Sequence, residues 1–365
     1  MHVGVPREIK NHEYRVGLTP PSVAELTARG HRVTVETGAG AGIDFTDDDY
    51  IAAGAGIAAG PEAVFAAAEM IVKVKEPQPH ECAMLRAGQT LFTYLHLAPD
   101  PQQAAALMAS GATCIAYETV TDTRGGLPLL RPMSEVAGRM SVQVGAHYLE
   151  KEQGGRGILL GGVPGVAPGR VAILGGGVSG VNAAQMAVGM RADVTIYDIS
   201  TARLAELDTM FEGRVKTAFA GSAAIAAAVA RAHLVIGAVL IPGAAAPKLV
   251  TRAMLASMKR GSVLVDIAID QGGCFETSHA TTHADPVYVV DGIIHYCVAN
   301  MPGAVARTST FALNNATLPF ALRLADLGPE AAMAADPHLA AGLNVSGGKI
   351  RHQAVADALG LEFVA

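Results

Sequence analysis

The chain has 365 residues, of which 50% are apolar, 16% charged and 5% aromatic, and its net charge is −6. The apolar content excludes an intrinsically disordered chain, and the acidic balance argues against a nucleic-acid-binding protein, which needs a basic excess to meet phosphates. At roughly 150 residues per domain, the length predicts about two domains.

The four cysteines, Cys82, Cys114, Cys274 and Cys297, form no C-x-x-C pair. This spacing is typical of free thiols in a reducing compartment. The first residues lack the features of a signal peptide. The most apolar stretch, 223–250, is interrupted by charged residues and a proline, whereas a membrane span needs about 20 uninterrupted apolar residues. We therefore expect a cytoplasmic protein without a membrane segment.

Strand-like and helix-like segments alternate along the first third of the chain. The predicted strands are 3–5, 32–36, 70–75, 90–96 and 113–117. Alternation with short connections is typical of a parallel sheet covered by helices on both faces. The Gly- and Pro-rich segment 121–133 is the best candidate for a domain boundary, and a helix is expected from Ser134, as its N-cap, to Glu150.

The same alternation continues more strictly after a Gly- and Pro-rich loop at 154–169. The predicted strands are 170–175, 193–198, 215–219, 234–240, 262–269 and 287–290, and the helices between them begin near Val178, Thr201, Ser222 and Pro247. A long helical pattern over 309–325 follows, and it is placed to return the chain to the first domain.

A glycine-rich turn follows the strand at 170–174. Residues 175–180 read GGGVSG and fit G-x-G-x-x-G, with glycines at Gly175, Gly177 and Gly180. The first glycine permits the tight turn, the second lets the backbone approach a pyrophosphate, and the third lets helix and strand pack closely. Exposed N–H groups at the start of the next helix then bind the phosphates. The context predicts a dinucleotide-binding Rossmann domain.

The next strand ends in Asp198, 18 residues after Gly180. A carboxylate there accepts hydrogen bonds from a ribose diol and repels a 2′-phosphate, so NAD(H) is favoured over NADP(H). The alternative is a solvated Asp198 beside an unrelated glycine-rich turn. Arg203, five residues further on, is either a solvated helix cation or a group that slightly weakens the preference.

Ligands of such sheets bind at the C-terminal ends of the parallel strands. Asp270 follows the strand at 262–269, and we expect it to face the nicotinamide end of the cleft. The alternative is a solvated acid in the Gly272-Gly273 turn. His279 and His283 have i,i+4 spacing, but no third ligand accompanies them, so no metal site is expected.

Three cationic side chains in the first domain are candidates for binding a small anionic substrate. Arg15 follows the first strand, whereas Lys75 and His96 are expected to end the strands at 70–75 and 90–96. At the ends of neighbouring parallel strands, they can converge on one cleft. Taken singly, each is better explained as a solvated or surface charge or, for His96, as an ordinary hydrogen-bonding histidine.

Several segments together carry a family resemblance over essentially the whole chain. They are PREIK (6–10), EYRVGLTP (13–20), VKEP (74–77), YLH (94–96), SEVAGR (134–139), the glycine turn and VANMPG (298–303). In this order and spacing they resemble bacterial L-alanine dehydrogenase, within the alanine dehydrogenase and transhydrogenase NAD-subunit family.

The resemblance implies NAD-dependent oxidative deamination of L-alanine to pyruvate and ammonia, and the reverse amination. It implies an α/β fold with a central, doubly wound Rossmann domain (129–305) and a discontinuous α/β substrate domain (1–128 and 306–365), commonly in a homohexamer. It assigns substrate binding to Arg15 and Lys75 and acid–base chemistry to His96 and Asp270.

With the glycine turn, the resemblance also gives a set of NAD contacts. These are Ser134, Gly175, Gly177, Val178, Ser179, Gly180, Asp198, Arg203, Val239, Leu240, Ile267, Ala268, Ile269, Asp270, Val298, Ala299, Asn300 and Met301. Two positions depart from the family pattern. Ala220 and His279 stand where a polar and a basic NAD contact are expected, so neither is assigned that role.

Three other functions remain open at this point. The first is the NAD-binding subunit of a proton-translocating transhydrogenase, which would have a membrane partner. The second is a 2-hydroxyacid dehydrogenase with the same two-domain plan, and the third is an inactive regulator that senses NAD. The preferred function needs only small-molecule partners, with neither nucleic acid nor membrane.

Overall fold

The computed structural model describes residues 1–239 and 246–364, which form two compact units. The first unit contains Met1–Met133 and Val305–Ala365, and the second contains Ser134–Ala304. The chain enters the second unit within helix α6 (Arg131–Tyr148) and returns to the first just before α11 (Ala306–Leu327). Among the described helices, none combines the length and the apolarity that crossing a membrane requires.

The first unit is built on an eight-stranded sheet of the order β15-β14-β6-β5-β4-β1-β2-β3. Its strands are β1 (His2–Val5), β2 (Arg32–Glu36), β3 (Gly56–Ala58), β4 (Met70–Val72), β5 (Thr90–Thr93), β6 (Thr113–Ala116), β14 (Leu343–Ser346) and β15 (Lys349–Ile350). The strands from β3 to β6 are parallel, and β14 joins β6 in antiparallel fashion. The C-terminal segment therefore completes a sheet begun at the N-terminus.

Helices flank this first sheet. They are α1 (Pro20–Ala28), η1 (Ala41–Ile43), α2 (Asp47–Ala52), α3 (Pro61–Ala67), α4 (Pro79–Cys82), α5 (Pro101–Ser110), η2 (Tyr117–Thr119), α11, α12 (Pro329–Ala335), α13 (Pro337–Ala340) and α14 (Gln353–Leu359). One core joins Phe65 of α3, Leu107 of α5 and Val355 of α14 to Leu91 of β5. Burial of such apolar side chains is the main force that holds the C-terminal helix to the N-terminal sheet.

The second unit is a doubly wound sheet of the order β12-β13-β11-β10-β7-β8-β9. Its strands are β7 (Arg170–Leu174), β8 (Asp193–Asp198), β9 (Lys216–Phe219), β10 (Leu234–Gly237), β11 (Val263–Asp266), β12 (Val287–Val290) and β13 (Ile293–Tyr296), and all except β12 run parallel. The strand order reverses beside β7, as in a Rossmann fold. The predicted α/β class with a parallel, doubly wound sheet is therefore confirmed.

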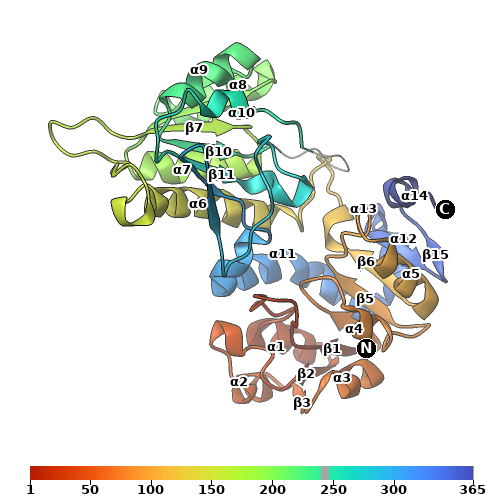
Figure 1. Ribbon diagram of the computed structural model, residues 1–365. Helices are drawn as coiled ribbons and strands as arrows, with labels where there is room; N and C mark the ends of the chain where they lie inside the picture. Colours follow the sequence, from red (N-terminus) through yellow and green to blue (C-terminus); the bar gives the residue numbers. More distant parts are fainter. Residues whose placement is uncertain (240–245, 365) are drawn as a thin grey trace. The chain divides into compact units, whose positions relative to one another are not determined.

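Helices cover both faces of the second sheet. They are α6, η3 (Lys151–Gln153), α7 (Val178–Gly189), α8 (Thr201–Phe211), α9 (Ser222–Arg231), α10 (Arg252–Leu255), η4 (Ile267–Gln271) and η5 (Met301–Val305). Helices α6 and α7 lie along one side of β7, β10 and β11, and α9 and α10 lie along the other (Figure 1). The glycine turn thus lies where β7 passes into α7.

Two helix starts differ from the prediction. Helix α6 begins at Arg131 rather than at a Ser134 cap, because Pro132 suits a first turn, where a backbone N–H is not needed. The helix expected near Pro247 begins at Arg252.

Several strands of the structure are shorter than predicted, and carboxylates lie at the ends of three of them. The strand expected at 70–75 ends at Val72, and soon afterwards Glu8 accepts the N–H of Val74 at 2.6 Å. The strand expected at 90–96 ends at Thr93, and the amides that follow turn to another carboxylate, described below. The strand expected at 262–269 ends at Asp266. The carboxylate of Asp266 accepts the N–H of Ala268 at 3.1 Å, where the chain passes into η4.

Buried charges hold the segment that precedes Lys75. The Nζ of Lys73 is fully buried and lies 2.7 Å from Oε1 of Glu81 and 3.3 Å from Oε2 of Glu8. Burial by itself lowers the pKa of Lys73, but the two carboxylates outweigh it and raise the pKa above the usual value. Burial raises the pKa of Glu8, against the opposing charge of Lys73. Lys73 therefore stays charged and neutralises carboxylates that water does not reach.

We expect Lys73→Met to lower the free energy of unfolding by about 3–5 kcal/mol, because it leaves two buried carboxylates without their cation. Urea unfolding followed by circular dichroism measures the change. The matched control is Lys216→Met, which removes an exposed partner of Asp193 and should cost about 1 kcal/mol or less. Equal stability of the two variants would contradict a structural role for the buried cluster.

Candidate active site

The glycine turn in the second unit has the conformation that pyrophosphate binding requires. Gly175 adopts φ of 104°, which side chains rarely allow, and a Cβ on Gly180 would lie only 1.9 Å from the carbonyl oxygen of Gly175. A Cβ on Gly177, by contrast, would meet open space. Gly177 caps α7 without a side-chain hydrogen bond, so the first N–H groups of this 12-residue helix are available to an anion. The residues therefore fit a dinucleotide.

Asp198 and Arg203 both hold the glycine turn. The carboxylate of Asp198 accepts the N–H of Gly176 and the N–H of Ser200, each at 2.8 Å. Arg203 donates from Nε to the carbonyl oxygen of Gly176 at 2.7 Å. Asp198 is thus neither simply solvated nor remote from the turn. The sequence did not indicate that Arg203 would bind the backbone of the same residue, Gly176.

The remaining predicted NAD contacts of the second unit follow the ends of its parallel strands. Val239 follows β10, whereas Leu240 lies outside the described residues. Asp270 is exposed in η4, two residues beyond the buried Ala268. Parallel strands end at one edge of a sheet, so these segments share the edge of the glycine turn.

The other predicted contacts lie in α6, in the segment after β13 and in the first turn of α7. Ser134 lies inside α6. The segment 298–301 follows β13, and within it Val298 and Met301 are buried while Asn300 has a left-handed φ of 58°. Ser179 and Val178 lie in the first turn of α7.

Asp266 organises the loop that carries Asp270, and sequence reasoning missed it. It is 1% exposed and accepts hydrogen bonds from the N–H of Cys274 at 2.9 Å and from the Ser278 hydroxyl at 2.5 Å. Burial raises its pKa, although these hydrogen bonds oppose the shift. The sequence signal for Asp266 was its position: it is a carboxylate that ends an apolar strand and precedes Asp270 by four residues.

In the first unit, Arg15 is held by a carboxylate two residues away. Glu13 accepts from Nε of Arg15 at 2.7 Å and from Nη2 at 2.5 Å, and Nη1 lies 3.0 Å from the Met133 sulfur. Burial by itself lowers the pKa of Arg15, but the Glu13 hydrogen bonds and charge raise it above the usual value. Arg15 is 2% exposed and is thus a fixed cation rather than a solvated one.

Lys75 lies in the loop three residues beyond β4. Its Nζ is 3.6 Å from Oε2 of Glu76, and Lys10 forms an ion pair with the other oxygen of the same carboxylate. Burial tends to raise the pKa of Glu76, but the two lysines lower it below the usual value. Two lysines therefore share one carboxylate here.

His96 lies in the loop beyond β5 with a left-handed φ of 49°. Its ring stacks on Tyr94 with centroids 5.6 Å apart and planes 7° apart, and 44% of its side chain is exposed. Tyr94 donates from its hydroxyl to the carbonyl oxygen of Leu129 at 2.6 Å, and burial raises the Tyr94 pKa. A fixed aromatic platform therefore supports the imidazole.

The structure brings the three cationic candidates to one edge of the first sheet. Arg15, Lys75 and His96 follow β1, β4 and β5, which are adjacent and parallel. Tyr94 links the group, because its phenol feels the charges of both Arg15 and Glu118. This arrangement suits a small substrate with a carboxylate and a group that exchanges protons.

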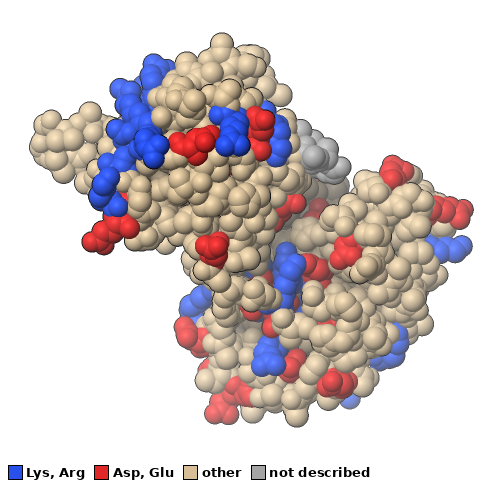
Figure 2. Space-filling model, in the orientation of Figure 1, with Lys and Arg blue, Asp and Glu red and all other residues tan. Residues whose placement is uncertain are grey.

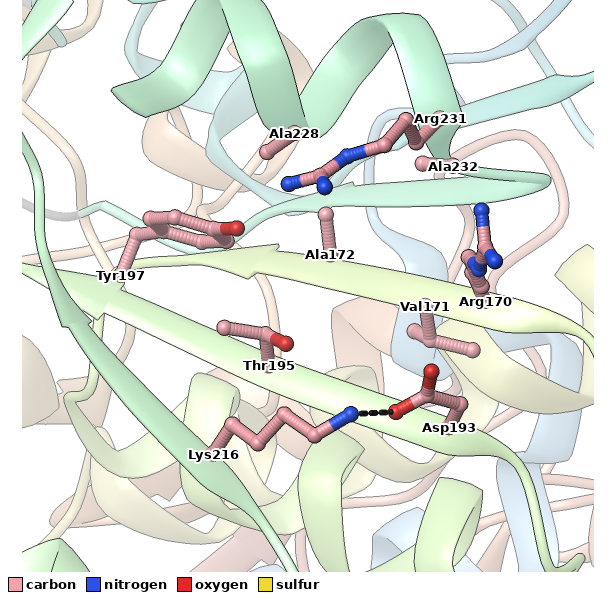
Figure 3. Close-up of a pocket in the computed structure, with 10 residues that line it drawn as sticks. All are labelled: Arg170, Val171, Ala172, Asp193, Thr195, Tyr197, Lys216, Ala228, Arg231 and Ala232. Carbon is pink, nitrogen blue, oxygen red and sulfur yellow. Dashed lines mark hydrogen bonds and ion pairs between the residues drawn. The ribbon is translucent and has the colours of Figure 1, made fainter.

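A cavity of about 310 Å³ in the second unit is not this site. Arg170, Asp193 and Lys216 line it at the amino ends of β7, β8 and β9, with Arg231 above them (Figure 3). The glycine turn follows the opposite end of β7. Lysine and arginine side chains gather on the second unit (Figure 2), and Arg231 ends α9, where a cation complements the helix dipole. The basic residues of this cavity are thus explained by the fold.

The histidine pair considered for metal binding has other contacts. His279 stacks on Tyr288 with ring centroids 3.6 Å apart, and Nε2 of His283 lies 3.1 Å from the carbonyl oxygen of Asn300. Within residues 1–239 and 246–364, no cluster of three or more His, Cys, Asp or Glu side chains is suited to a metal ion.

Fold and site together define a two-unit α/β protein with a dinucleotide-binding turn in one unit and a cationic site in the other. Residues 4–137 match the family described as alanine dehydrogenase/PNT, N-terminal domain, and residues 141–353 match the C-terminal domain of the same family. The chain belongs to the alanine dehydrogenase/PNT family.

Individual relatives agree with this assignment. The chain is 63% identical to an alanine dehydrogenase of Halomonas elongata, with 100% of this chain and 98% of the relative covered. A solved structure of an L-alanine dehydrogenase superposes with a TM-score of 0.96 at 53% identity, over 99% of each chain. A transhydrogenase structure from Sinorhizobium meliloti superposes with a TM-score of 0.85 at 26% identity, over 96% of this chain and 100% of that one.

We expect Asp198→Ala to raise the KM for NAD by at least about tenfold, because it removes a charged hydrogen-bond acceptor worth about 1.5–3 kcal/mol and loosens the Gly176 peptide. The KM for alanine should change little. Steady-state kinetics with each substrate varied in turn provide the measurement, with Asp198→Asn as the variant that keeps an acceptor oxygen. An unchanged NAD dependence would mean that the ribose is held elsewhere.

Proposed function

We propose that this protein catalyses the NAD-dependent oxidative deamination of L-alanine to pyruvate and ammonia, together with the reverse reductive amination. The carrying observation is that Arg15, Lys75 and His96 follow three adjacent parallel strands, in a chain whose other unit has a dinucleotide turn. The 63% identity to an alanine dehydrogenase supports the same substrate. The transhydrogenase alternative has weaker support, at 26% identity.

The substrate carboxylate binds to the cations of the first unit. Arg15 presents a guanidinium whose Nε and Nη2 edge is already held by Glu13, so its orientation is set before the substrate arrives. Such positioning can supply several kcal/mol of the barrier, up to roughly 7–11 in the best cases. Lys75 adds a compact positive charge beside the carboxylate and the developing carbonyl oxygen.

Proton transfers fall to His96 and Asp270. NAD, when bound, accepts the hydride from Cα of alanine. His96 removes a proton from the substrate nitrogen or from the carbinolamine, a contribution of about 10²–10⁴-fold. Asp270 orients or deprotonates the water that attacks the iminium carbon. Both side chains are exposed, as proton transfer to and from a bound substrate or water requires.

The organisation of the protein is part of the same proposal. We assign substrate binding to 1–128 with 306–365, and NAD binding to 129–305. We also propose a homohexamer, the assembly that the family resemblance implies. The segment 154–169 extends from the second sheet (Figure 1) and exposes the apolar side chains of Leu159 and Val166, which supports self-association. Cytoplasmic location is supported by four free cysteines, all buried.

The decisive assay offers the purified protein NAD with a panel of amino and hydroxy acids at alkaline pH. We expect absorbance of NADH to rise with L-alanine and not with lactate or glycerate, because the chain is 63% identical to an alanine dehydrogenase. Reduction by lactate would indicate a 2-hydroxyacid dehydrogenase. Absence of any turnover, with NAD still bound, would favour a transhydrogenase subunit or an NAD-sensing regulator.

Two variants should separate binding from chemistry. His96→Ala should lower kcat by about 10²–10⁴-fold while NAD still binds, because it removes the proton-transfer group. Arg15→Ala should mainly raise the KM values for alanine and pyruvate, because it removes the carboxylate partner. Near-normal kcat in the first variant, or unaltered KM values in the second, would refute the respective role.

A further inference from the structure

Glu118 joins two neighbouring strands at the site. It lies in η2, immediately after β6, and β6 pairs with β5 in parallel register. Its Oε1 accepts the N–H of His96 at 2.6 Å, and both of its oxygens lie 3.2 Å from the N–H of Leu95. One carboxylate thus replaces the sheet partners that these two amides would have had if β5 had continued.

The backbone of His96 needs such support. Its φ of 49° falls in the left-handed region, which is unfavourable for a residue with a Cβ and persists only where the surroundings enforce it. A charged acceptor binds an N–H more strongly than a neutral one does. The hydrogen bond at 2.6 Å is therefore well suited to hold this conformation, and the conformation decides where the imidazole lies.

Glu118 is committed to these amides. No lysine or arginine among the described residues forms an ion pair with it, and its carboxylate is 14% exposed. Its charge also acts on Tyr94 and His352; burial raises the pKa of Tyr94 and lowers that of His352, so both are neutral near pH 7. The Nδ1 of His96 lies 3.9 Å from Oε1, which is too far for a hydrogen bond.

We infer that Glu118 is a positioning residue for the reaction: by binding the amides of Leu95 and His96 it fixes the left-handed turn that aims the His96 imidazole at the substrate. The stacked Tyr94 ring sets the plane of the imidazole. Glu118 fixes the backbone of His96, from which the imidazole extends. The inference rests on the proposed role of His96 in proton transfer.

The test compares Glu118→Met, which removes the acceptor, with Glu118→Gln, which keeps one acceptor oxygen. A catalytic group displaced by about 1 Å can cost about 10²-fold in rate. Glu118→Met should therefore lower kcat by about 10–100-fold with KM values for alanine, pyruvate and NAD within about twofold, because Arg15 and the glycine turn are untouched. The kcat of Glu118→Gln should be at least about tenfold higher than that of Glu118→Met.

Glu69 offers a matched control. It accepts the N–H of His2 at 2.6 Å in the same unit, at the amino end of β4 and away from the strand ends that carry the cations. Glu69→Met should leave kcat unchanged even where it lowers the melting temperature. A similar loss of kcat in Glu69→Met and Glu118→Met would show general destabilisation and would overturn the inference.

His96→Ala, assayed in parallel, distinguishes a failure of the Glu118 positioning role from a failure of the proposed His96 role. If His96→Ala is inactive and Glu118→Met keeps kcat within about twofold, the positioning role fails and the proposed function stands. If His96→Ala itself is active, the proposed role of His96 fails, and the positioning role of Glu118, which rests on it, fails as well. Should Glu118→Met not fold, Glu118→Asp decides, because it withdraws the carboxylate by one methylene: unchanged kcat in this variant overturns the inference.

Discussion

Buried or half-buried carboxylates that accept backbone amides are the constraint on which the sites of this protein depend. Glu8 binds the amide of Val74, Glu118 those of Leu95 and His96, and Asp266 those that follow β11. Each carboxylate binds amides just beyond the end of a parallel strand. The charge-assisted hydrogen bond is stronger than the sheet bond that it replaces, so the chain leaves the sheet in a defined direction.

The burial of these carboxylates makes the cations around them necessary. Glu8 is tolerated because Lys73 lies 3.3 Å away, and Lys73 is held in turn by Glu81. A buried pair of this kind adds little net stability compared with apolar packing, but it strongly penalises any other arrangement. The result is that buried ion pairs hold the segment immediately before Lys75.

Sequence reasoning succeeded where the chemistry is encoded in short spacings. The doubly wound fold and the position of the glycine turn between a strand and a helix follow from residue types that have few alternatives, such as a glycine that a Cβ at 1.9 Å would exclude. It failed at strand ends, because Val74 and Leu95 look like good strand residues and their partners, Glu8 and Glu118, lie 66 and 23 positions away. Leu240, among the predicted NAD contacts, lies outside the described residues.

The fold by itself does not select the reaction. A transhydrogenase structure shares it with a TM-score of 0.85, although only 26% of residues are identical. What distinguishes one chemistry from another on a common fold is the set of side chains at the strand ends. In this chain those side chains come in cation–carboxylate pairs, Arg15 with Glu13 and Lys75 with Glu76. Because each cation is already held by its own carboxylate, little side-chain ordering is left for the substrate to induce, and the entropic cost of binding is correspondingly lower.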